Sequence, residues 1–321
     1  MTIGRRAVMA GMAAALLPGV ARAAEAGVPP PDRELRVKVA GGSLYVRING
    51  DLKAKRPPLL MVHGGPGGAL WQFFPALPLA DTRAVVLYDQ LDSGRSDAPG
   101  DKANWTVDRF VGEIAAIRAA LGLEQVHLLG HSWGGIVANR YAATRPAGLR
   151  SLVLQGAPLS ARRAKDSIAS LLPGLPDGAG AVLAAGAASD PAAYGKAMGV
   201  FMRKHLARTS VRDVAMPYMA PTPEDRGDAV AAAIAGTDLV GGFEGALAGF
   251  DDDGLARRVT APTLLMCGEL DIMTPAATRA MLPLFGRADF AMLSGAGHMA
   301  QFDAPAAWRD TLSRFIARHD G

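Results

Sequence analysis

Short apolar runs alternate with amphipathic segments along most of the chain, and this alternation limits the possible folds more than any other feature. Leu59–His63, Ala84–Asp89 and Val126–Gly130 are runs of the type found in strands buried on both faces. Thr106–Leu121 places its apolar residues on one face of a helix, as a helix that packs on such a sheet does. Strands that alternate with helices predict an α/β fold with a mostly parallel central sheet and helices on both faces.

The pattern continues to the end of the chain with one interruption. The other predicted elements are a hairpin of Leu35–Val39 and Ser43–Ile48, strands at Leu149–Gln155, Thr263–Cys267 and Phe290–Leu293, and a closing helix at Pro305–His319. Residues 159–254 are rich in alanine, glycine and aspartate and show no strong strand pattern. We therefore predict a helical cap at 159–254, inserted into a core formed by residues 34–158 and 255–321.

The first 23 residues have the layout of a bacterial signal peptide. A basic pair, Arg5–Arg6, precedes the apolar stretch Ala7–Leu17, and Ala21–Ala23 matches the small-x-small pattern of a cleavage site. The arginine pair indicates the twin-arginine export route, and the apolar stretch is too short to span a bilayer. We expect a periplasmic or secreted chain that begins near Ala24, is not stably inserted in a membrane, and carries a proline-rich linker at 24–33. An amphipathic N-terminal segment is the alternative.

Composition and charge exclude several classes of protein. The chain has 34 basic and 30 acidic residues, a net charge of +4, and no stripe of lysine and arginine that would indicate nucleic-acid binding. The signal segment carries three arginines and no acidic residue, so the mature chain has a net charge near +1. The single cysteine excludes an internal disulfide framework, and no Cys/His cluster has the spacing of a zinc site. We expect no metal and no organic cofactor; the sequence does not indicate an oligomeric state.

Ser132 is the candidate nucleophile. It lies in Gly130-His131-Ser132-Trp133-Gly134, a G-x-S-x-G motif directly after a predicted strand and before a helix that runs to about Thr144. A serine hydroxyl is a poor nucleophile unless it is exposed and paired with a base, and the sharp strand–helix turn provides that exposure. The start of the helix also favours developing negative charge. The alternative is an ordinary serine in a glycine-rich turn.

A second glycine-rich loop, His63–Gly68, follows an earlier predicted strand. Acyl transfer requires two backbone N–H groups directed at the developing oxyanion. We expect one from Trp133, directly after the nucleophile, and the other from Gly65. Pro66 shapes the loop but has no N–H to donate. A plain turn is the alternative interpretation of this loop.

The general base and its acidic partner are expected after the serine in chain order. Five of the six histidines lie in the glycine loops, in a strand, in the cap or at the chain end: His63, His131, His127, His205 and His319. His298 remains, on the loop after the last predicted strand. Asp271 follows the strand that ends at Cys267 and can orient the imidazole and stabilise its protonated form. Glu269 is the closest rival for that role; Asp303 is better explained as a cap of the last helix.

Several of these motifs together resemble one known family. They are HGGPGG, YDQLDSGRSD, GHSWGG, GELDIMTP and GAGHM. This set resembles the proline iminopeptidases, prolyl aminopeptidase-like members of the α/β-hydrolase superfamily. The resemblance implies an α/β-hydrolase fold, a triad of Ser132, Asp271 and His298, and an oxyanion hole of Gly65 and Trp133. It also implies release of an N-terminal proline from small peptides.

Members of that family hold the free α-amino group of the substrate with glutamates of the cap. The only glutamates between residues 159 and 254 are Glu224 and Glu244, so we expect these two to bind substrate. The alternative is that both are simply solvated. Asp92 stands where the family often has glycine. Two other functions are compatible with the sequence, namely an esterase, amidase or lactonase acting on small acyl substrates with the same triad, and a non-catalytic binding protein on the same scaffold.

Overall fold

The computed structural model describes residues 28–209 and 226–321. The predicted signal peptide, the first part of the predicted linker and Glu224 therefore lie outside the described residues. Within them, eight strands form one sheet in the order β1-β2-β4-β3-β5-β6-β7-β8. They are β1 (Arg33–Val39), β2 (Gly42–Asn49), β3 (Leu59–Val62), β4 (Val85–Tyr88), β5 (Val126–His131), β6 (Leu149–Gln155), β7 (Thr263–Gly268) and β8 (Ala288–Leu293).

The sheet confirms the predicted fold class. β1 and β2 form an antiparallel hairpin and β2 also pairs antiparallel with β4, whereas all other neighbours are parallel. Every predicted strand is present, and no end differs from the predicted one by more than two residues. β5 includes His131, one residue past the predicted end, and β8 begins at Ala288, two residues early. The central strands are buried along their whole length, which explains their continuous apolar sequence.

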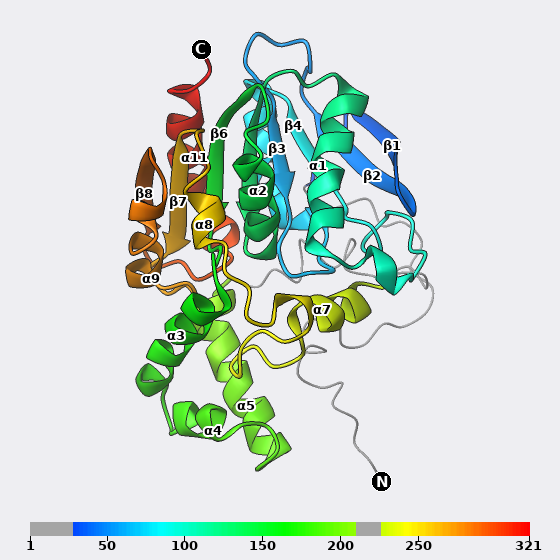
Figure 1. Cartoon of the computed structure of the whole chain (residues 1–321). Coiled ribbons are helices and arrows are strands. Elements are labelled where there is room, and N and C mark those ends of the chain that lie inside the picture. The colour runs from blue at the N-terminus through cyan, green and yellow to red at the C-terminus, as the bar shows by residue number, and fades with distance from the viewer. Residues whose placement is uncertain (1–27, 210–225) are drawn as a thin grey trace.

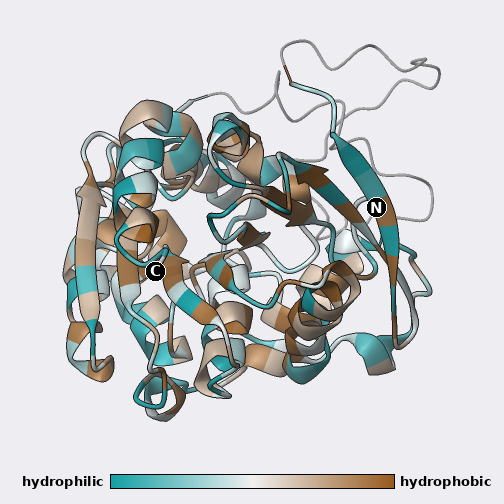
Figure 2. Cartoon of the chain, turned by 90° about the horizontal axis from the view of Figure 1, so that it is seen from above, coloured by the Kyte–Doolittle hydropathy of each residue, from teal (hydrophilic) through white to brown (hydrophobic). Residues whose placement is uncertain are grey.

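Helices cover both faces of the sheet (Figure 1). The sheet separates the hydrophobic core into two layers. One layer contains α1 (Val107–Leu121), α2 (Trp133–Ala143) and the short α8 (Asp253–Ala256). The other contains the 3₁₀ segment η2 (Leu70–Asp81), α10 (Ala300–Asp303) and the closing helix α11 (Pro305–Ala317). Figure 2 shows hydrophobic residues gathered on the inner strands and hydrophilic residues on the outer elements. Two prolines inside η2 explain why no helical pattern is visible in its sequence.

The stretch without strand pattern forms helices beyond the carboxyl ends of the parallel strands (Figure 1). It contains α3 (Ala161–Leu171), η4 (Leu172–Gly174), α4 (Ala179–Ala185), α5 (Pro191–Phe201), a π-helical turn η5 (Met202–Leu206), α7 (Gly227–Ala235) and η6 (Gly245–Leu247). α3, α4 and α5 pack around an apolar cluster of their own. The remaining short helices belong to the core domain and not to the cap. They are η3 (Lys102–Asn104), α9 (Pro275–Arg279) and η7 (Leu282–Leu284). No helix of the described residues is long and apolar enough to cross a membrane.

The two connections between cap and core are tied to each other. Ala161 donates its N–H to the Phe250 carbonyl at 2.9 Å, and Asp252 donates its N–H to the Leu159 carbonyl at 2.7 Å. The buried Asp252 carboxylate accepts two hydrogen bonds from Arg140 of α2, at 2.8 and 2.9 Å. The cap therefore leaves and re-enters the core through one fixed stem.

The described part of the predicted linker already lies along β2. Asn49 donates its side-chain N–H to the Pro30 carbonyl at 2.8 Å, and Arg47 donates to the carbonyl of Pro29. Asp32 donates its N–H to the Ile48 carbonyl at 3.0 Å. These residues are thus fixed to the sheet before β1 begins at Arg33.

A second set of serine, histidine and aspartate lies at the amino ends of β5 and β6. The His127 ring contacts Ser151 Oγ at 2.8 Å through Nδ1 and Asp320 Oδ1 at 3.0 Å through Nε2. Arg83 donates to both oxygens of the Asp320 carboxylate, at 2.8 and 3.0 Å. Ser151 is fully buried, so its hydroxyl cannot meet a substrate. This group joins the residues after α11 to the sheet and has a structural role.

Replacing Asp320 with asparagine is expected to lower the free energy of unfolding by about 2 kcal/mol at pH 7, because it leaves the buried Arg83 guanidinium without its carboxylate. Burial acts to raise the pKa of Asp320, but Arg83 and His127 outweigh it and hold the pKa below its usual value. The stabilisation is therefore present above about pH 4 and is lost as the pH falls through the lower, folded-state pKa.

Urea unfolding of the unaltered chain and of Asp320→Asn, at pH 7 and at pH 3, measures the difference in the free energy of unfolding. Asp310→Asn is the matched control, since Asp310 is exposed on α11. Equal unfolding midpoints for Asp320→Asn and Asp310→Asn at pH 7 would contradict the structural role of the group.

Candidate active site

Ser132 lies on a strained turn between β5 and α2. Its backbone has φ 54° and ψ −121°, a conformation that costs free energy in a residue other than glycine. The flanking glycines make the turn possible. A Cβ on Gly130 would lie 2.2 Å from the Gly134 carbonyl oxygen, and one on Gly134 would lie 2.1 Å from the Val62 carbonyl oxygen. The G-x-S-x-G spacing is therefore a packing requirement of the turn that presents Ser132.

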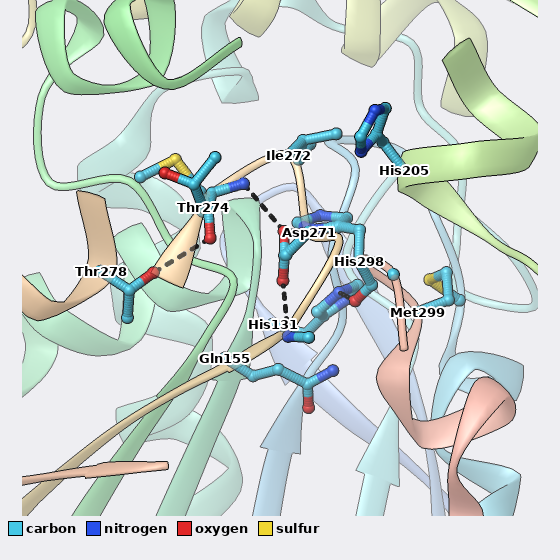
Figure 3. A network of polar contacts seen from close by, with 12 residues as sticks. His131, Gln155, His205, Asp271, Ile272, Thr274, Thr278, His298 and Met299 are labelled. Atoms are coloured by element: carbon cyan, nitrogen blue, oxygen red, sulfur yellow. Dashed lines mark hydrogen bonds and ion pairs between the residues drawn. The ribbon is translucent and has the colours of Figure 1, made fainter. Parts of the chain in front are cut away.

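Asp271 and His298 form a buried pair (Figure 3). Asp271 Oδ1 lies 2.7 Å from His298 Nδ1, and the carboxylate also accepts the N–H of Met273 at 2.8 Å and that of Gly268 at 3.3 Å. A carboxylate in this position holds the proton on Nδ1 and leaves Nε2 as the basic nitrogen. Asp271 follows β7 and His298 follows β8, so the structure brings them together at the carboxyl edge of the sheet.

Gly156 lies against this pair. No sequence pattern had identified it as part of the site. A Cβ at Gly156 would lie 2.7 Å from His298 Nδ1 and 3.0 Å from Asp271 Oδ2, and its φ is +55°. Gly156 directly follows β6, the strand between the nucleophile strand β5 and the acid strand β7. Its place directly after Leu149–Gln155 is the signal that could have identified it. A side chain here would separate the acid from the base.

The two amides predicted for the oxyanion hole are both free to donate. Trp133 is the first residue of α2, and the first N–H groups of a helix have no acceptor within it. The Gly64 amide donates to Gln72 Oε1 at 2.8 Å, whereas the exposed Gly65 amide has no acceptor within the described residues. The assignment of Gly65 and Trp133 stays a prediction that this geometry allows.

Two glutamines hold the glycine-rich loop His63–Gly68, which we call the oxyanion loop. Gln72 of η2 accepts from the Gly64 N–H and donates to the Gly64 carbonyl at 3.2 Å. Gln90 donates to the His63 carbonyl at 3.0 Å and accepts the Trp133 indole N–H at 2.8 Å. Gln90 belongs to the YDQ motif, whereas Gln72 lies in a segment without a recognisable pattern. Together they fix the loop against the first turn of α2.

The two histidines of the glycine loops are buried and neutral. Burial lowers the pKa of His63 to about 4. Burial and the nearby His298 hold the pKa of His131 well below its usual value. The His131 ring lies 4.7 Å from the ring of His298, and its Nε2 contacts the His298 carbonyl at 3.1 Å. These residues support the site and do not compete with His298 as a base.

The rival acids have other partners. Glu269 is exposed and accepts the Gly295 N–H at 2.8 Å and the Ser294 hydroxyl at 3.0 Å. The prediction that Asp303 caps the last helix is wrong, because the residue that precedes α11 is Ala304. The Asp303 carboxylate instead accepts the N–H of Gly297 at 2.8 Å, beside the catalytic loop. No group of acidic, histidine and cysteine side chains within the described ranges could hold a metal ion.

The start of α7 in the cap lies against the oxyanion loop. A Cβ on Gly67 would lie 2.0 Å from the Gly227 carbonyl oxygen at the start of α7. Arg226 donates its N–H to the Asp92 carbonyl at 3.1 Å. Asp92 has φ 64°, a conformation that favours glycine, and its buried carboxylate accepts the N–H of Gly100 at 2.6 Å and the Trp105 indole N–H at 2.8 Å.

Within the described residues, Glu244 forms no hydrogen bond or ion pair with Ser132, Asp271 or His298. Glu244 is exposed at the start of η6, and its contacts within the described part of the chain are with Gly236 and Ala235. Glu224 lies outside the described residues. The substrate-binding role of both glutamates stays a prediction.

Known proteins share this architecture and sequence. A family model described as the alpha/beta hydrolase fold matches residues 57–305. A proline iminopeptidase of Levilactobacillus brevis is 32% identical over 293 residues, which cover 86% of this chain and 93% of that protein. One of Heyndrickxia coagulans is 30% identical over 262 residues, covering 81% and 90%. The crystal structure of a proline iminopeptidase of Mycobacterium smegmatis matches with a TM-score of 0.81 and 29% identity, covering 90% and 99%.

These matches confirm the family that the sequence motifs indicated. They cover 86% and 90% of this chain, so the likeness is not limited to the catalytic loops. The chain therefore belongs to the α/β-hydrolase family and, within it, to the proline iminopeptidase-like hydrolases.

Proposed function

We propose that this hydrolase acts through Ser132, His298 and Asp271 and removes an N-terminal proline or a similar residue from small peptides. The observation that carries the proposal is the position of the strained Ser132 turn at the same sheet edge as the buried Asp271–His298 pair. The names of the relatives support the substrate class. A complete set of nucleophile, base and acid disfavours a non-catalytic binding protein.

The proposed reaction proceeds through an acyl-enzyme. His298 Nε2 takes the proton of the Ser132 hydroxyl as Oγ attacks the acyl carbon, and Asp271 stabilises the imidazolium that forms. The Gly65 and Trp133 amides hold the oxyanion. His298 then gives the proton to the departing amine, and a water molecule activated by the same base releases the acyl group.

A small ester, amide or lactone is the second candidate substrate class. The exposed position of Glu244 favours it, because an ammonium group bound in a cleft requires a carboxylate beside it. The triad and the chemistry are the same for both classes. The difference lies in whether the site recognises a free amine.

Ser132→Ala is expected to lower kcat at least about 10³-fold on any substrate, because no other hydroxyl replaces the nucleophile. Ser294→Ala is the matched control, since Ser294 is exposed and contacts only Glu269 through its hydroxyl. Steady-state rates, with circular dichroism to verify folding, measure the effect. Undiminished turnover by folded Ser132→Ala would exclude the proposed mechanism.

Blocking the substrate amine is expected to lower kcat/KM by at least about 100-fold, because the carboxylate that binds the ammonium group then has no charged partner. The comparison uses proline p-nitroanilide, its N-acetyl analogue and p-nitrophenyl acetate. Glu224→Gln and Glu244→Gln, measured with the unblocked substrate, identify the residue that binds the amine. Equal rates for free and blocked substrates would exclude amine recognition and favour the ester, amide or lactone class.

We also propose that the chain is exported and that cleavage occurs after Ala23. Removal of residues 1–23 is expected because of the basic pair, the apolar stretch and the small-x-small site. N-terminal sequencing of the protein isolated from the periplasm or medium of its native host checks this, with a sequence starting near Ala24 as the expected result. A chain that retains Met1 in those fractions would overturn it.

A further inference from the structure

The π-helical turn η5 of the cap pairs with the loop that carries the catalytic base. His298 donates its N–H to the His205 carbonyl at 2.9 Å, and Met299 donates its N–H to the Leu206 carbonyl at 2.7 Å. The approach is close enough that a Cβ on Gly297 would lie 2.9 Å from the His205 carbonyl oxygen. The backbone of the base is thus held by the cap as well as by the core.

The side chain of His205 reaches the loop that carries the acid (Figure 3). Its Nδ1 lies 2.7 Å from the carbonyl oxygen of Leu270, the residue directly before Asp271. A carbonyl only accepts, so Nδ1 carries the proton and donates. One residue therefore contacts the acid loop through its side chain and the base loop through its carbonyl.

The surroundings of His205 indicate that this contact is the reason for a histidine at the position. The side chain is buried against Phe201, with ring centroids 5.2 Å apart. Its Nε2 is buried and has no partner within the described residues, which is unfavourable. An apolar side chain would fill the space without that cost but could not donate to Leu270. π-Helical turns are also frequent at functional sites.

We propose that His205 is a positioning residue that keeps Asp271 and His298 at hydrogen-bonding distance by holding both of their loops at once. Through this residue, the placement of the cap sets the geometry of the acid–base pair. This role rests on the proposed function, in which Asp271 and His298 serve Ser132. Displacement of η5 removes the donor from Leu270 and the acceptor from the His298 amide together.

Three variants of the full chain test the role. His205→Phe keeps a ring against Phe201 but has no donor, and His205→Asn retains an N–H close to the position of Nδ1. Arg203→Ala is the control, because Arg203 is an exposed residue of the same turn. With p-nitrophenyl acetate we expect His205→Phe to lower kcat about tenfold with little change in KM, since small misplacements of catalytic groups reduce the chemical step. We expect His205→Asn to recover most of the rate and Arg203→Ala to match the unaltered chain.

Two further measurements separate positioning from stability. A loosened Asp271 stabilises the His298 imidazolium less, so the acid limb of the kcat/KM profile of His205→Phe is expected to move to lower pH. The far-downfield proton resonance of the Asp271–His298 hydrogen bond, observed without substrate, is expected to weaken in His205→Phe and to persist in His205→Asn.

An unchanged kcat, pH profile and resonance in His205→Phe would overturn the inference. Equal losses in His205→Phe and His205→Asn would also overturn it, because the donor would then not matter. If the unaltered chain hydrolyses no substrate of the panel, the proposed function fails. The resonance in the two variants still decides whether His205 positions the pair.

Discussion

The catalytic edge of this sheet depends on close backbone contact that no side chain would permit. A Cβ would lie 2.2 Å from a carbonyl oxygen at Gly130, 2.1 Å at Gly134 and 2.3 Å at Gly268, and 2.7 Å from the base at Gly156. Gly130, Gly156 and Gly268 are at or next to the ends of β5, β6 and β7, and Gly134 lies in the first turn of α2. Because they lack side chains, the loops that carry nucleophile, acid and base approach one another. The geometry of the triad is a consequence of that contact.

Much of the fold and the centre of the site could be predicted because both depend on local pattern. Apolar runs identified the six strands from β3 to β8, a hairpin pattern identified β1 and β2, and Ser132, Asp271 and His298 were found from their places after apolar runs. Gln72 and His205 could not be found in this way. Gln72 lies in a proline-containing 3₁₀ segment, and the role of His205 arises from contacts with residues 65 and 93 positions away along the chain. The partners of Gln72 and His205 are set by tertiary packing, which local sequence periodicity does not indicate.

Residue type alone does not make a catalytic site in this protein. Ser151, His127 and Asp320 have the same functional groups as the proposed triad and are hydrogen-bonded to one another. They lie at the amino ends of the strands, where the serine is fully buried and its backbone is part of β6. Ser132 differs because it lies on a turn at the carboxyl end, with free amides beside it. In an α/β sheet the carboxyl ends face the ligand, so placement separates the two groups.

The cap is joined to this catalytic edge at two places that differ in kind. His205 and Leu206 accept hydrogen bonds from the base loop, whereas Arg226 donates to Asp92 near the oxyanion loop. At Asp92 the left-handed backbone of a residue other than glycine is unfavourable, and three hydrogen bonds to its carboxylate and carbonyl offset the cost. Since the base loop and the oxyanion loop each contact the cap at one of these junctions, the position of the cap affects both sides of the catalytic edge.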